Sequence, residues 1–233
     1  MAVAQPTDSG TRPRQLSLAL QHAESFARED FFAGASNAAA LALVENWPDW
    51  PSPAMVLAGP EGCGKSHLAA IWAAASGARI IAARALSEAR PPAALATGAL
   101  VIEDLAPGNI DEAALFHLLN FAREEDASIL VTTRTPPAGW AIGLHDLASR
   151  LRALPVVTLA APEDSLLRAV MVKLAADRQL AIEEDVISYV LRRIERSFAA
   201  ARTAMIRLDH EALQQKRPIT RALAGELFRA RHA

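Results

Sequence analysis

The sequence predicts an α/β fold in which a parallel sheet, covered by helices on both faces, precedes a small all-helical domain. Three observations predict this. Short, continuously apolar segments alternate with helical patterns up to about residue 162, as in strands that are buried on both faces. A glycine-rich loop joins one of these strands to a helix. After Pro162 the strand patterns stop and only amphipathic helical patterns remain.

The overall composition is that of an ordered globular protein, with 233 residues of which 52% are hydrophobic and 21% charged. No apolar run is long enough to cross a bilayer, and the polar N-terminus lacks the apolar centre of a secretory signal. We therefore expect a cytoplasmic protein without a membrane partner. A net charge of −2 argues against a strongly basic nucleic-acid surface, and a single cysteine, Cys63, excludes an internal disulfide.

The N-terminal half begins with a polar leader, residues 1–14, followed by an alternating apolar segment, residues 15–20. A helix is expected from about residue 38, because Ser36-Asn37 is a start signal and two prolines follow its apolar pattern. Strands are expected at 54–58, 79–82 and 99–102. A helix after the first strand extends to about residue 75, where Gly77 offers a cap.

The C-terminal half contributes a helix from near Asp111, strands at 128–132 and 156–159, and four helices at 163–176, 183–196, 200–214 and 219–229. These elements divide the chain into three predicted parts. Residues 1–25 form a flexible leader, residues 26–162 a nucleotide-binding domain, and residues 163–233 a helical lid domain.

The most informative motif is Gly59–Ser66, which reads G-x-x-x-x-G-K-S between a strand and a helix. Backbone N–H groups of such a loop, with the helix N-terminus behind them, bind the phosphates of ATP or ADP. Lys65 would reach the β- and γ-phosphates, and the Ser66 hydroxyl would ligate Mg²⁺. The flanking strand and helix favour this interpretation over a glycine-rich turn that matches by chance.

Two acidic residues, Glu103 and Asp104, follow an apolar strand and would emerge beside this loop. Glu103 could hold the magnesium shell and Asp104 could orient an attacking water, whereas the simpler interpretation is a strand that meets solvent. The next strand ends in Thr132-Thr133, where a hydroxyl such as that of Thr133 could sense the γ-phosphate. A β-branched strand end explains either threonine almost as well.

Arg150 lies in the segment Asp146–Arg152, ahead of the last strand. From there it could project into the nucleotide site of a neighbouring molecule, as an arginine finger supplied in trans. Taken as sequence alone, the segment is also an ordinary basic helix end.

The order of these motifs resembles the AAA+ module of the bacterial replication initiator DnaA, over residues 26–233. The resemblance rests on Phe31–Asn37 near the adenine, Gly64–Leu68 in the P-loop, Thr132–Pro137 at sensor 1, and Leu147–Leu151 in the arginine-finger box. It implies an AAA+ αβα sandwich with a helical lid. It also implies nucleotide contacts by Phe32, Ala33 and the lid arginine Arg202. The further DNA-binding domain of initiators is not expected in this chain.

Residues 15–20 read Q-L-S-L-A-L and resemble the peptide by which proteins dock on the sliding clamp of the replicative polymerase. In an extended peptide Leu16, Leu18 and Leu20 share one side, and Gln15 and Ser17 complete the motif. By composition alone, an N-terminal edge strand is the simpler interpretation. A clamp peptide before an initiator-like AAA+ module resembles the Hda (HdaA) family, which implies that the protein stimulates ATP hydrolysis on DnaA and reaches DNA mainly through the clamp.

The sequence departs from this resemblance at three places. Glu103 stands where active AAA+ ATPases usually have Asp, and Arg134 where initiators usually carry an acidic or amide residue. No lid arginine aligns with the usual sensor-2 position, for which Arg202 and Arg196 are the nearest. These departures imply weak intrinsic ATP hydrolysis at most. The predicted nucleotide-binding residues are Phe32, Ala33, Gly59, Pro60, Gly62, Cys63, Gly64, Lys65, Ser66, His67 and Arg202.

The sequence leaves two other functions open. A helicase loader or remodelling motor would use Glu103 and Asp104 for its own ATP turnover, whereas a small-molecule kinase fits the four-helix lid poorly. Basic residues at 192–193, 216–217 and 221 could touch DNA phosphates, although solvated helix faces explain them equally well. The sequence also leaves open whether the protein forms a homodimer.

Overall fold

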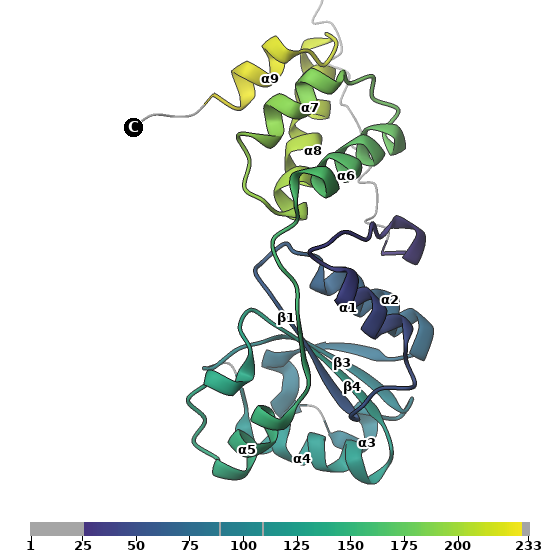
Figure 1. Ribbon diagram of the computed structural model, residues 1–233, viewed down its shortest axis with the longest axis vertical. Coiled ribbons are helices and arrows are strands. Elements are labelled where there is room, and N and C mark those ends of the chain that lie inside the picture. Colours follow the sequence, from purple (N-terminus) through teal and green to yellow (C-terminus); the bar gives the residue numbers. More distant parts are fainter. Residues whose placement is uncertain (1–25, 89, 109, 230–233) are drawn as a thin grey trace, which may run out of the picture.

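The computed structural model describes residues 26–88, 90–108 and 110–229, which form a sheet domain and a helical domain (Figure 1). The five strands are all parallel in the order β2-β3-β4-β1-β5. Their bounds are β1 Ala54–Ala58, β2 Arg79–Ala82, β3 Ala99–Leu105, β4 Ser128–Thr133 and β5 Val156–Thr158. The predicted parallel sheet is confirmed.

Helices cover both faces of this sheet, as the continuously apolar strands predict. One face packs against α1 (Ala38–Glu45) and α2 (Lys65–Ser76), with Trp72 fully buried between helix and sheet. The other face packs against α4 (Glu112–Glu124) and α5 (His145–Ala153), with the short α3 (Pro91–Ala94) at its edge. Since successive strand side chains point to opposite faces, each buried strand supplies both cores.

The strand β3 is longer than predicted, because it continues beyond Ile102 to Leu105. Asp104 adopts a left-handed conformation, with φ of 55°, and the register with β4 shifts between Ile102 and Leu105. The extension therefore carries the acidic pair past the regular ladder with β4, to the carboxyl edge of the sheet, although Glu103 still pairs with Ala82 of β2.

The helical domain contains α6 (Asp164–Asp177), α7 (Glu184–Leu191), α8 (Phe198–Gln215) and α9 (Arg221–Leu227), packed around a core of their own. The predicted helix over 183–196 is too long, since α7 ends at Leu191. The chain turns after Leu191, and α8 then begins at Ser197, whose side chain caps it by accepting from the N–H of Ala200 at 3.0 Å. None of the helices in the described ranges combines the length and apolar character that a membrane span requires.

Two contacts position the helical domain over the sheet domain. The backbone N–H of Phe198 donates to the Gly62 carbonyl at 2.9 Å, so α8 begins directly on the glycine-rich loop. Glu163, just before α6, accepts from the Ala35 N–H at 2.9 Å. Hydrogen bonds from its own backbone N–H, the Ser36 hydroxyl, and the Ala35 and Ser36 N–H groups hold the pKa of Glu163 below its ordinary value.

Candidate nucleotide-binding site

The glycine-rich loop joins β1 to α2 at the carboxyl edge of the sheet. Two of its residues adopt left-handed conformations that favour glycine, Gly62 with φ of 70° and Gly64 with φ of 103°. Gly64 is the N-cap of α2, so the loop runs directly into a helix N-terminus. Backbone N–H groups and the positive end of the helix dipole are thereby presented together, which is the arrangement that binds phosphate.

Lys65 is buried at the first position of α2, with only 7% of its surface exposed. Its Nζ donates to the carbonyls of Gly59 at 2.9 Å and Pro60 at 2.8 Å. The ammonium group is therefore held inside the loop by neutral acceptors. A phosphate oxygen offers a stronger, charge-assisted partner.

Cys63 belongs to the same loop and is buried, with its Sγ 3.9 Å from Lys65 Nζ. Burial raises the pKa of the thiol, although the positive charge of Lys65 opposes this rise. The thiol is therefore neutral at physiological pH, and Cys63 acts as a small buried side chain.

A cavity of about 840 Å³ lies between this loop and the helical domain. This volume falls in the usual range for a small-molecule or cofactor pocket. The sheet domain supplies one wall and helices α6 and α8 the other. Among the predicted site residues, the lining includes Phe32, Gly62, Gly64, Lys65, Ser66, His67, Asp104 and Arg202.

Aromatic side chains line the part of the cavity next to the start of α2. The His67 ring makes edge contacts with Phe26 and Phe31, at centroid distances of 5.4 and 5.2 Å. Its Nε2 lies 3.1 Å from the Ala27 carbonyl. These flat apolar surfaces suit a nucleotide base.

The loop that carries Phe32 is fixed by Asn37, which is buried at 2% exposure. The Asn37 side chain donates to the Phe32 carbonyl at 3.0 Å and accepts from the Gly34 N–H at 2.8 Å. Ala33, in the same loop, is exposed and does not line the cavity.

The left-handed backbone conformation of Asp104 separates its side chain from that of Glu103 at the end of β3. Asp104 lines the cavity, and its N–H donates to Thr132 Oγ1 at 3.0 Å. Glu103 is half-buried and does not line the cavity. Thr133 is buried, and its hydroxyl donates to the Thr135 carbonyl at 3.0 Å. Of these predicted residues, the structure brings only Asp104 to the cavity.

Magnesium would find few protein ligands here. In the described part of the chain, no three His, Cys, Asp or Glu side chains come together in a way that could hold a metal ion. The cavity does contain the Ser66 hydroxyl and the Asp104 carboxylate. This donor set fits Mg²⁺ held mainly by phosphate oxygens and water, as is usual for that ion.

The helical domain brings Arg202 to the cavity, whereas Arg196, the other predicted candidate, pairs with Asp164 at 2.6 Å and does not line it. Sequence patterns do not reveal Lys173 on α6, which lines the cavity and bridges the two domains. Its Nζ lies 2.7 Å from carboxylate oxygens of both Asp30 and Asp177. The i,i+4 spacing favours the Asp177 partner, but no local pattern predicts Asp30.

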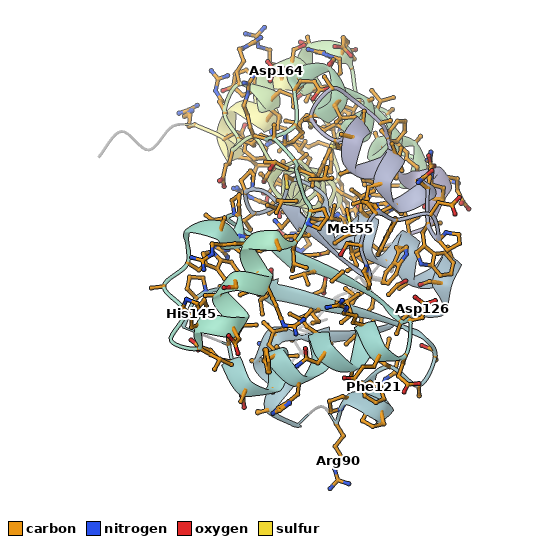
Figure 2. The ribbon with its side chains drawn as sticks, turned by 60° about the horizontal axis from the view of Figure 1, so that its bottom comes forward. Met55, Arg90, Phe121, Asp126, His145 and Asp164 are labelled. Atoms are coloured by element: carbon orange, nitrogen blue, oxygen red, sulfur yellow. The ribbon has the colours of Figure 1, made fainter. Side chains whose placement is uncertain are left out.

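Arg150 does not line the cavity of its own chain. It lies half-buried on α5, with its guanidinium 5.2 Å from the centre of the Phe116 ring. Figure 2 shows His145, the first residue of α5, on the sheet domain and well separated from Asp164 in the helical domain. The predicted clamp-binding residues 15–20 lie outside the described residues.

A parallel sheet with a phosphate-binding loop after β1 and a helical lid over that loop defines the AAA+ class of proteins. Within that class, residues 164–224 match the family described as Hda, lid domain. The chain thus combines a DnaA-like AAA+ fold with a lid that matches the Hda family.

Solved structures of other proteins share this fold, including the following three. Domain III of the Thermotoga maritima initiator DnaA is 18% identical, with a TM-score of 0.71 over 87% of this chain and 95% of that chain. AMPPCP-bound DnaA from Aquifex aeolicus is 20% identical, with a TM-score of 0.61 over 81% of this chain and 67% of that chain. A RuvB variant from Thermotoga maritima is 19% identical, with a TM-score of 0.66 over 88% of this chain and 72% of that chain.

Proposed function

We propose that this protein is a nucleotide-binding regulator of chromosome replication initiation. It docks on the polymerase sliding clamp and promotes ATP hydrolysis by the initiator DnaA. The observation that carries the proposal is the Hda-type lid on a DnaA-like fold, because the lid distinguishes this chain from AAA+ proteins in general.

Nucleotide binding is supported by the cavity itself. Lys65 exchanges the Gly59 and Pro60 carbonyls for phosphate oxygens, and the N–H groups of the loop bind the remaining phosphate charge. The base packs among the aromatic side chains near His67. When bound, Mg²⁺ would be held beside Ser66 and Asp104 and would neutralise phosphate charge. A DnaA structure of the same fold contains AMPPCP.

A role for Arg150 in the nucleotide site of a second protein is supported by its position. Its guanidinium lies on α5 against the Phe116 ring, outside the cavity of its own chain, and so can act at the site of another molecule without leaving a partner in its own cavity. An arginine supplied in trans stabilises the charge that develops during phosphoryl transfer.

Clamp docking is tested with a chain that lacks residues 15–20. We expect this deletion to abolish retention on immobilised clamp and to abolish stimulation of DnaA on clamp-loaded DNA. ADP affinity should not change, because tethering acts through local concentration and not through the cavity. Full stimulation by the deleted chain would contradict the docking proposal.

The trans role is tested with Arg150→Ala, with Arg152→Ala as the matched control. Arg152 lies on the same helix, is exposed, and donates to the Ser149 hydroxyl at 3.4 Å. Arg150→Ala should lower the rate of DnaA-bound ATP hydrolysis by about 10³-fold or more while preserving clamp binding. Arg152→Ala should stay near the wild-type rate. Equal rates in both variants would remove Arg150 from the mechanism.

A self-acting ATPase is the alternative that Asp104 favours, since this carboxylate lines the cavity opposite the lid. Steady-state ATP turnover by the isolated protein separates the two functions. The regulator turns over slowly alone, whereas a loader or motor turns over rapidly and loses activity in Asp104→Asn.

A further inference from the structure

Positive charge is concentrated in the last part of the helical domain. Residues 192–229 include nine Arg or Lys residues and four Asp or Glu residues, whereas the whole chain has a net charge of −2. They extend from the end of α7 through α8 and α9, and α9 packs against both other helices (Figure 1). This asymmetry indicates a region that meets an anionic partner.

Three arginines of this region lie against two aromatic rings. The guanidinium carbon of Arg193 is 3.6 Å from the centre of the Tyr189 ring, and that of Arg221 is 5.5 Å from the same centre. On α8, the guanidinium carbon of Arg207 is 4.9 Å from the centre of the Phe228 ring. Since α9 carries Arg221 and ends at Phe228, it joins the two stacked groups. We call the three arginines the arginine cluster.

Hydrogen bonds to main-chain carbonyls orient two members of the cluster. Arg193 Nη1 donates to the Tyr189 carbonyl at 3.1 Å, and Arg207 Nη2 donates to the Leu227 carbonyl at 3.0 Å. Within the described part of the chain, neither forms an ion pair with a carboxylate. A guanidinium has five N–H groups. Most of them therefore remain available to an oxyanion, and stacking has already oriented the group that carries them.

A second cavity, of about 490 Å³, brings these two arginines together beside the glycine-rich loop. Arg193 and Arg207 both line it, on the side of α8 where the turn from α7 enters. The Glu61 carboxylate also lines it but pairs with Arg134 at 2.6 Å, so the carboxylate that opposes an anion there is chiefly that of Glu195. The cavity thus offers two oriented cations on a concave surface.

We propose that the arginine cluster and this cavity bind the phosphate backbone of double-stranded DNA directly. Arginine binds a phosphate through two parallel N–H groups. Phosphates repeat at short intervals along a duplex, so several arginines are occupied together, whereas one acidic side chain of a protein partner would occupy only one. Such contacts position a protein on DNA without reading its sequence. The inference goes beyond the proposed clamp docking and does not depend on it.

The test measures binding of the full chain to a short labelled DNA duplex by fluorescence anisotropy, without clamp or DnaA and over a range of salt concentrations. Arg193→Ala and Arg207→Ala should each weaken binding about three- to tenfold and reduce the salt slope by about one. The double variant should lose nearly all affinity. Glu195→Gln should strengthen binding about threefold, because a carboxylate beside the phosphates is gone.

The control is Arg90→Ala, since Arg90 is exposed and projects away from the sheet domain (Figure 2). It should bind the duplex as the wild type does. Arg193→Lys should lie between wild type and Arg193→Ala, because it retains the charge and loses the planar fork. Melting temperatures of all variants verify that they are folded.

Two results would overturn the proposal. One is wild-type protein that does not bind the duplex at low salt, and retention of DnaA through the same arginines would then identify a protein-binding surface instead. The other is duplex binding that the double variant leaves unchanged, or that Arg90→Ala weakens equally. ADP affinity and clamp retention should be unaltered in the arginine variants, so failure of this inference leaves the proposed function intact.

Discussion

Lys65→Ala is expected to weaken the binding of both ADP and AMPPCP by about 100-fold or more, because two charge-assisted phosphate contacts of about 1.5–3 kcal/mol each are lost. Lys65 is the buried cation at the first position of α2, and its Nζ is held by the Gly59 and Pro60 carbonyls beside the Cys63 sulfur. Calorimetric titration with each nucleotide measures the effect. Because Lys65 reaches the phosphates shared by both nucleotides, the loss should not distinguish ADP from AMPPCP strongly.

Lys173→Ala is the matched control for this experiment. It removes a lysine from the same cavity, but one whose Nζ is already bound by Asp30 and Asp177 at 2.7 Å. We expect a loss below about tenfold, because this cation contributes little new charge to a bound phosphate. Similar losses in the two variants would show that general positive charge, and not the position of Lys65, determines affinity.

Gly62→Ala is expected to lower the melting temperature by about 6–12 °C, corresponding to about 3 kcal/mol for a chain of this size. A β-carbon at Gly62 would lie 2.6 Å from Ser197 Cβ. It would also occupy a left-handed conformation, with φ of 70°, which costs an alanine about 1 kcal/mol. The start of α8 would have to move, and the bond from the Phe198 N–H to the Gly62 carbonyl would be disturbed.

The control for this prediction is Gly98→Ala. Gly98 has a similar positive φ of 75°, but a β-carbon there would meet nothing within 4 Å among the residues that the structure describes. Its substitution therefore reports backbone strain alone, for which we expect a decrease of about 2–4 °C. Differential scanning calorimetry of both variants isolates the contact between lid and loop. Equal decreases would indicate that this contact adds no stability.

Most of the sheet domain is predictable from local patterns. The bounds of β2 agree with the prediction, and Gly77 caps α2 in a left-handed conformation as expected. The helical domain is less predictable, because the amphipathic pattern continues beyond Leu191 while the chain itself turns. The start of α8 after that turn is fixed by the Ser197 cap and by the bond from the Phe198 N–H to the Gly62 carbonyl, and local sequence does not predict the second of these contacts.

The sequence alone predicts the phosphate-binding loop and the order of strands and helices. Both depend on the spacing of residue types that lie close together along the chain. Tertiary packing was needed to show that Asp104 and Arg202, and not Glu103 and Arg196, reach the cavity, and that Arg134 pairs with Glu61. These outcomes depend on where segments far apart in the chain come together. They depend also on the left-handed backbone conformation of Asp104, which separates its carboxylate from that of Glu103.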